Sequence, residues 1–185
     1  ALATQSKADT IIRITADCPF ADSDLIKKAI KLFNSKDVDY LSNVLDRSYP
    51  DGLDIEVFSY KALKETYEKC KDISLREHVT PYMKKNHYNE YLSGNFKTFN
   101  FKNDIDFSHL RWTLDTEDDY SFLKKLAEKL DMKFKWMSAI SELTKDVSLL
   151  TWNRGVHSRK GALLGQENKN TKKNFYKNSN NLFDK

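Results

Sequence analysis

Short apolar runs alternate with segments of helical periodicity along most of the chain, and this alternation narrows the possible folds more than any other feature. The first run, residues 10–16, is rich in β-branched residues and predicts a strand. Ser23 precedes a segment to about Phe33 whose apolar side chains share one helical face, so we expect Ser23 to cap a helix there. Strands that alternate with helices are typical of an α/β sandwich around a mainly parallel sheet, which is the fold class that we predict.

The same alternation continues to residue 143. Ser59 and Thr116 each precede a helical segment, and their hydroxyls are suited to cap it. Further strands are predicted at residues 38–43, 53–58, 96–101 and 111–114. Further helices are predicted at residues 59–70, 76–85, 116–130 and 136–143, with Pro81 either in the first turn or at a bend of the second of these.

Basic residues are concentrated at the C-terminal end. The formal net charge is +4, yet residues 153–185 alone hold eight Lys/Arg and two Asp/Glu. Because this Asn- and Lys-rich segment has little periodicity, we divide the chain into a folded part, residues 1–152, and a tail or linker, residues 153–185, that could lead to a further domain. No aromatic-rich RNA-binding pattern accompanies the basic tail, so we do not expect a nucleic-acid partner.

Composition favours a cytoplasmic protein without a membrane partner. No apolar run approaches the ~20 residues needed to span a bilayer, and the first ten residues lack the apolar core of a signal peptide. The two cysteines, Cys18 and Cys70, show neither a secreted disulfide framework nor zinc-ligand spacing. We therefore expect both thiols to be reduced.

Two acids stand directly after predicted strands. Asp17 follows the run at residues 10–16, and Asp115 follows the run at residues 111–114. Ligands of open α/β sheets bind at the carboxyl ends of strands, and Mg²⁺ is commonly held by one or two carboxylates together with phosphate oxygens and water. These two acids are therefore candidate catalytic and metal-binding residues. The alternative is that both are ordinary turn or cap acids.

Two further stretches carry candidate substrate contacts. PDGLDIEVFS places two acids on one strand face, where they could bind sugar hydroxyls or a cation, or could simply be solvated. REHVTPY carries an Arg-Glu-His triplet, whose arginine could hold a carboxylate or phosphate; a surface ion-pair set is the alternative. The candidates are Asp54, Glu56, Arg76, Glu77 and His78. No Gly-rich phosphate loop occurs among only five glycines.

Taken in order, RITADCP, PDGLDIEVFS, REHVTPY and LRWTLDTEDDY resemble the cytidylyltransferases of spore-coat polysaccharide synthesis. These enzymes are relatives of the acylneuraminate and 3-deoxy-manno-octulosonate cytidylyltransferases. The resemblance covers residues 10–120 and continues more faintly to about residue 152. It implies a Rossmann-like nucleotidyltransferase fold with three layers, and Mg²⁺-dependent transfer of CMP from CTP to a sugar or sugar acid, with release of pyrophosphate.

The resemblance also implies roles for individual residues. Asp17 and Asp115 would be the metal ligands. The sugar side of the cleft would be lined by Arg13, Asp54, Glu56, Arg76, Glu77 and His78. An aromatic-rich segment at residues 76–101 lies where related enzymes often dimerise, so a homodimer is one possible assembly.

The chain departs from the family at its start. Family members begin with a strand and a loop of the form GSTRLPGK, which holds the CTP phosphates, and nothing similar occurs here. We therefore expect an N-terminally truncated domain of which residues 1–152 are the C-terminal portion. The alternative is a non-catalytic sugar-binding or dimerisation module left from such an enzyme, which could be fused to an aminotransferase.

Overall fold

The computed structural model describes residues 2–88 and 96–153. The predicted basic tail, apart from Asn153, lies outside the described residues, as does part of the aromatic-rich segment proposed for a dimer contact. Within the described residues, no helix is long and apolar enough to cross a membrane.

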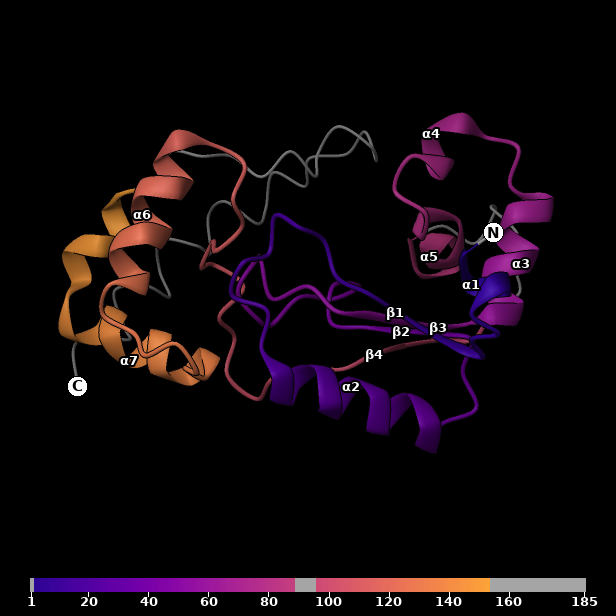
Figure 1. Cartoon of the computed structure of the whole chain (residues 1–185), viewed down its shortest axis with the longest axis horizontal. Helices are drawn as coiled ribbons and strands as arrows, with labels where there is room; N and C mark the ends of the chain where they lie inside the picture. Colours follow the sequence, from indigo (N-terminus) through magenta and orange to yellow (C-terminus); the bar gives the residue numbers. More distant parts are fainter. Residues whose placement is uncertain (1, 89–95, 154–185) are drawn as a thin grey trace. The chain divides into compact units, whose positions relative to one another are not determined.

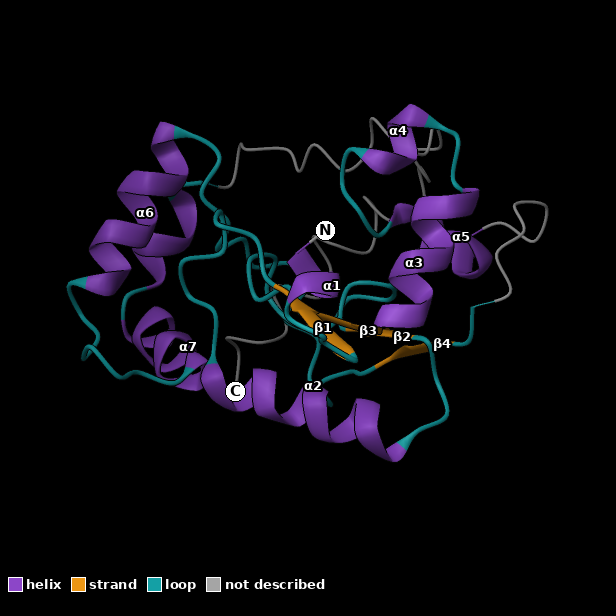
Figure 2. Cartoon of the chain, turned by 45° about the vertical axis from the view of Figure 1, so that its right-hand side comes forward, coloured by secondary structure: helices purple, strands orange, loops and turns teal. Residues whose placement is uncertain are grey.

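Four short strands form one sheet in the order β1-β3-β2-β4 (Figures 1 and 2). β3 runs antiparallel to both of its neighbours, and only the β2–β4 pairing is parallel. The strands are β1 (Thr10–Arg13), β2 (Tyr40–Ser42), β3 (Glu56–Ser59) and β4 (Thr98–Asn100). The prediction of a mainly parallel sheet is therefore wrong. The chain returns from β2 to β3 without a crossover helix, and such a direct return pairs strands antiparallel.

The predicted strand at residues 111–114 is also absent. This segment forms one isolated bridge, Asp51 to Arg111, within the described residues. The turn at Gly52 packs so closely on it that a Cβ at this glycine would lie 2.4 Å from the backbone carbonyl carbon of Trp112. Gly52 has φ +110°, which favours glycine, and it is the residue that allows the two backbones to meet.

Helices cover both faces of the sheet. Leu41 and Val57 belong to the large core on the face that α2 covers. α2 packs on β2 and β3 and runs along one face of the sheet (Figures 1 and 2). Tyr40 and Phe58 point to the opposite face, into a smaller core with Ala62 of α3 and Met83 of α5. This arrangement confirms an α/β fold with helical layers on both faces. The bounds of these helices are α2 (Ser23–Ser35), α3 (Tyr60–Lys69) and α5 (Pro81–Tyr88).

Of the remaining helices, three contribute side chains to the large core, and two are short helices of four residues each. α6 and α7 contribute Phe122, Leu126 and Trp136 to the large core. The elements are α1 (Leu2–Gln5), α4 (Ile73–Arg76), α6 (Glu117–Ala127), α7 (Trp136–Lys145) and a 3-10 helix η1 (Val147–Thr151). The helix predicted over residues 76–85 begins only at Pro81, as α5, so this proline lies in the first turn, which is one of the two positions predicted for it. Proline is well accommodated at a helix start, and the residue that precedes it disfavours the helical conformation.

Helix starts follow the predicted caps in two of three cases. Ser59 accepts a hydrogen bond from the Ala62 backbone N–H (3.0 Å) and begins α3. Thr116 and Asp119 form a reciprocal capping box at α6. For α2, the cap is Asp22 rather than Ser23. One oxygen of Asp22 accepts from the first turn of α2, which is the N-cap interaction.

Candidate active site

Three of the four strands end on the same side of the sheet. We call this side, which is formed by strand ends and not by an outer strand, the edge of the sheet. β1, β2 and β4 run in one direction and β3 in the other, so the carboxyl ends of the three meet the amino end of β3. Arg13 pairs in register with Glu56, Glu56 with Ser42, and Ser42 with Asn100. The expectation that ligands bind where strands end therefore points to this edge, despite the mixed sheet.

The two predicted metal ligands lie on segments that are joined at this edge. The backbone N–H of Leu114 donates to the carbonyl oxygen of Asp17 (2.8 Å), and the Thr113 hydroxyl donates to the same oxygen (3.2 Å). Asp115 follows directly in the chain. Residues almost 100 positions apart are thus brought together by two hydrogen bonds, and the segments carrying both carboxylates are neighbours.

Arg111 organises the acids on the second segment. Its guanidinium donates to Asp115 (2.7 Å) and, with two nitrogens, to Asp119 (2.9 and 2.8 Å). Asp119 is fully buried and also accepts from Asn153 (3.2 Å). Burial alone would raise the pKa of Asp119, but hydrogen bonds from Arg111 and Asn153 outweigh burial and hold this pKa below its usual value. Burial likewise disfavours the charge of Arg111, yet its carboxylate partners raise its pKa.

A second arginine extends this network to the PDGLD turn. Arg47 binds both carboxylate oxygens of Asp54 (2.5 and 2.9 Å) and lies 3.2 Å from Asp51. Asp51 in turn lies 3.6 Å from Arg111. Burial raises the pKa of Asp51, and the two guanidinium groups only partly offset that effect. Acids and arginines therefore alternate across the edge, and Asp54 is paired with Arg47 rather than standing free on a strand face.

Glu56 is the centre of a separate group of polar residues. It is 3% exposed and forms an ion pair with Arg13. It also accepts from the Tyr40 hydroxyl (2.6 Å) and the Thr80 hydroxyl (2.7 Å), and pairs with Lys84 (2.5 Å). Burial would raise the pKa of Glu56, but the charge of Lys84 and the hydrogen bonds from Lys84, Tyr40 and Thr80 together lower it below its usual value.

The Arg-Glu-His triplet lies apart from these contacts. Arg76 donates to the carbonyl oxygen of Cys70 (3.3 Å) and lies over the Tyr67 ring. Glu77 and His78 are exposed. In the part of the chain that the structure describes, the REHVTPY stretch reaches the edge through Thr80, and the triplet makes no contact with Glu56 or with the arginine network.

Sequence reasoning missed Arg47, Asp51, Lys84, Arg111 and Asn153. Arg111 had a weak local signal, because both of the acids that it binds follow it within the same short motif, LRWTLDTEDDY. Lys84 and Asn153 had none, since their partners lie 28 or more residues away.

The residues present fit a magnesium ion in type and number. Among residues 2–88 and 96–153, no group of three or more His, Cys, Asp or Glu side chains could hold a metal by itself. Mg²⁺ usually needs only one or two carboxylates, because nucleotide phosphates and water complete its shell. Asp17 is the less engaged of the two predicted ligands: its side chain accepts a long contact from the Cys18 thiol (3.7 Å), whereas Asp115 already binds Arg111.

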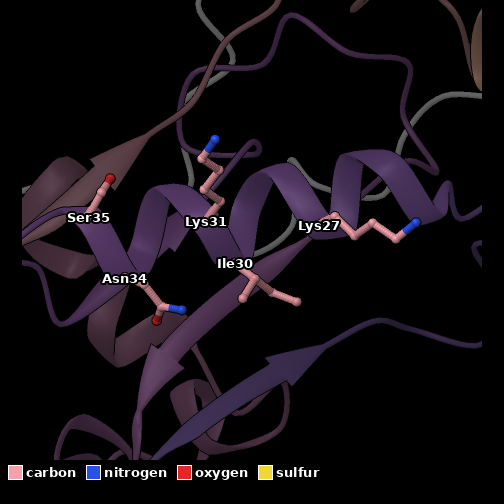
Figure 3. A pocket seen from close by; sticks show the side chains of 5 residues that line it. All are labelled: Lys27, Ile30, Lys31, Asn34 and Ser35. Carbon is pink, nitrogen blue, oxygen red and sulfur yellow. The ribbon is translucent and has the colours of Figure 1, made fainter.

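A shallow hollow lies elsewhere in the described residues. It has a volume of about 450 Å³ and is lined by residues of α2 alone (Figure 3). The lining residues are Lys27, Ile30, Lys31, Asn34 and Ser35. None of the predicted site residues lines it, so the candidate site is the polar edge of the sheet rather than this hollow.

Together, the helix-covered sheet and the acids gathered where three strands end define an α/β domain with a candidate site at the strand ends. Residues 1–143 match the family model described as cytidylyltransferase, and the chain belongs to that family of nucleotidyltransferase enzymes.

Two known proteins are similar to this chain, and one of them is a cytidylyltransferase. A cytidylyltransferase structure from Leptospira borgpetersenii serovar Hardjo-bovis is similar with a TM-score of 0.75 at 31% identity, over 85% of this chain and 64% of that one. A protein of Methanocaldococcus jannaschii, described as uncharacterized, is 31% identical over 126 residues, which are 67% of this chain and 48% of that protein. This chain thus spans about half to two thirds of the length of these relatives.

Proposed function

We propose that this chain is part of a cytidylyltransferase that moves CMP from CTP to a sugar or sugar acid and releases pyrophosphate, in the cytoplasm, for surface polysaccharide synthesis. The observation that carries the proposal is the junction of the Asp17 and Asp115 segments at the edge where β1, β2 and β4 end. Family membership supports the reaction type.

In the proposed reaction, a sugar hydroxyl attacks the α-phosphorus of CTP and pyrophosphate leaves. Asp17 and Asp115 would hold Mg²⁺, which supplies positive charge to the phosphate oxygens when it is bound. Arg111 donates to Asp115 at 2.7 Å and thereby fixes the direction of this carboxylate. Asp51 lies between Arg111 and Arg47 and contacts both guanidinium groups.

We further propose that the nucleotide is held largely by sequence that the relatives possess and this chain does not span. The open edge of β1 supports this idea: among the described residues β1 pairs only with β3. Ile12 and Ile14, on and just after that strand, are 41% and 38% exposed. A further strand along β1 would cover these side chains. Residues 1–152 would then be the C-terminal portion of the catalytic domain, followed by a linker at 153–185.

The test is release of pyrophosphate by the intact native protein with CTP, Mg²⁺ and a panel of neutral and acidic sugars. We expect Asp17→Asn and Asp115→Asn each to lower kcat at least ~100-fold, since each removes a charge that would hold the metal. The exposed Asp104→Asn serves as the matched control and should keep its activity. Full turnover in either site variant would refute the metal assignment. No release by the unaltered protein would refute the proposed reaction and favour a non-catalytic module.

A further inference from the structure

Two cations contact one buried carboxylate at the end of the sheet where β1, β2 and β4 end. The side chain of Glu56 is 4% exposed, whereas those of Arg13 and Lys84 are 27% and 20% exposed. The three residues come from β3, β1 and α5, so three separate elements meet at this point. Two positive charges against one negative charge leave a net positive, partly open spot.

Glu56 is fully engaged by these neighbours. Its Oε1 accepts from Tyr40, Thr80 and Lys84, and its Oε2 faces Arg13. A buried carboxylate with these partners is costly to disturb, because loss of one partner leaves charge uncompensated. Glu56 therefore holds the two cations in place and leaves contact with a ligand to them.

Arg13 and Lys84 keep donors for a further partner. A guanidinium has five N–H groups and an ammonium has three, and the structure shows Arg13 using Nη1 and Lys84 meeting one carboxylate. Within the described residues, neither cation pairs with a second acid. Arg47 and Arg111 differ in this respect, since each lies between two or more carboxylates.

The position of the pair relates it to the reaction. Arg13 is the last residue of β1, and Asp17 lies in the turn that follows. The same edge thus carries an acid-rich network suited to a cation and, next to it, a cationic pair suited to an anion. Charge-assisted contacts from partly desolvated cations are among the stronger polar interactions available to a protein.

We propose that Arg13 and Lys84 form an anion subsite, with Glu56 as its positioning residue, which binds a negatively charged oxygen group of a reactant. The group is either a phosphate of the nucleotide or pyrophosphate, or the carboxylate of an acidic sugar. This inference rests on the proposed cytidylyltransferase function for its choice of reactants. Its geometry rests on the contacts of Glu56 alone.

Binding by the intact native protein tests the subsite. Calorimetry would measure the affinity for CTP, for inorganic pyrophosphate and for N-acetylneuraminate in Arg13→Gln and Lys84→Gln. We expect each substitution to weaken one of the two anion classes about tenfold, the size of one charge-assisted hydrogen bond. A loss for CTP and pyrophosphate identifies a phosphate, and a loss confined to N-acetylneuraminate identifies a carboxylate.

The matched control is Lys102→Gln. Lys102 follows β4 near the same edge but is paired with its own carboxylate, Asp46, so its loss should change each affinity less than twofold. If Arg13→Gln and Lys84→Gln also keep all three affinities within twofold, the subsite is refuted. The pyrophosphate-release assay on the unaltered protein fails or succeeds independently of this result.

The positioning role of Glu56 has a separate test in a mutant cycle. If Glu56 acts through the two cations, Glu56→Gln weakens anion binding in the otherwise native protein but changes it less than twofold in the Arg13→Gln/Lys84→Gln background. A general structural role would lower the affinity by the same factor in both backgrounds, and that result would overturn the assignment.

Discussion

The burial of a charge at Glu56 is the most consequential single feature at the residue scale. A carboxylate that is 3% exposed remains ionised because two cations and two hydroxyls surround it. Its folded-state pKa lies below the ordinary value of 4.5. Such a group stabilises the fold fully above its unfolded pKa, and this contribution is lost as the pH falls through the folded pKa.

Glu56→Gln should therefore destabilise the fold in a pH-dependent way. At pH 7 we expect a loss of about 3 kcal/mol, because two partly buried cations lose the buried charge that they share. The difference from the unaltered protein should stay constant down to about pH 4.5 and shrink in more acidic solution. Urea unfolding at several pH values measures it. The exposed pair Glu65–Lys69 provides the control, since Glu65→Gln should cost under ~0.5 kcal/mol. A loss that did not vary with pH would contradict the ionised state of Glu56.

At the residue scale, sequence reasoning found acids more readily than their partners. Asp17, Asp54 and Asp115 stand in short motifs, and the structure places all three at the edge. Arg47 was missed because its segment has no regular periodicity, and both of its acidic partners, Asp51 and Asp54, come to it only through the turn between them. The roles of these acids in catalysis stay predictions until turnover is measured.

The turn at residues 50–52 matters most at the scale of elements. It meets the segment that carries Arg111 through two backbone hydrogen bonds, Asp51 N–H to Leu110 (2.8 Å) and Trp112 N–H to Asp51 (2.5 Å). Because this contact brings Asp51 towards Arg111, a backbone approach of one turn supports the acid network.

Gly52→Ala should disrupt that approach. The added methyl group would lie 2.4 Å from backbone atoms that cannot rotate away, at a φ of +110° that disfavours any side chain. We expect a loss of about 3 kcal/mol, or a fall in Tm of roughly 6–12 °C. Asn34→Ala on the exposed face of α2 is the control and should shift Tm little. Thermal unfolding followed by circular dichroism measures both, and an unchanged Tm in Gly52→Ala would show that the turn can relax without cost.

Helix caps show where local reasoning succeeds and where it ends. Ser59 and Thr116 were predicted because a cap bonds to N–H groups only two or three positions ahead. The α2 cap was misassigned by one residue. Asp22 takes the role while its second oxygen accepts from the Trp136 backbone N–H (2.8 Å), a partner 114 positions away. This long-range hydrogen bond favours an acid at position 22, and no local sequence pattern indicates it.

At the scale of the whole molecule, the feature that matters most is the side of β1 that is unpaired among the described residues. In the described residues β1 pairs on one side only, and a strand edge with exposed isoleucines is a surface that proteins normally pair or protect. A strand paired with β1 would also lie next to Arg13, at the end of β1, and next to the turn that carries Asp17.

Ile12→Lys tests whether a further strand covers this surface. In the 185-residue chain by itself, the substitution should change stability by under ~0.5 kcal/mol, because the side chain is already 41% exposed. In the intact native protein, it should cost about 1–3 kcal/mol if a neighbouring strand buries that position. Chemical unfolding of both lengths gives the comparison. Equal effects in the two would contradict coverage of β1.

The sequence by itself determined the number and kind of most elements, two of the three predicted caps and the identity of the acids at the edge. These depend on apolar periodicity and on contacts within a few residues, which can be read along the chain. Tertiary structure alone decided the direction of β3, the loss of the strand at 111–114, the arginine network and the gathering of cations around Glu56. Each of these depends on contacts between backbone groups or charges that are tens of residues apart in the sequence. The free energy of such contacts comes from burial and pairing, which no single segment specifies.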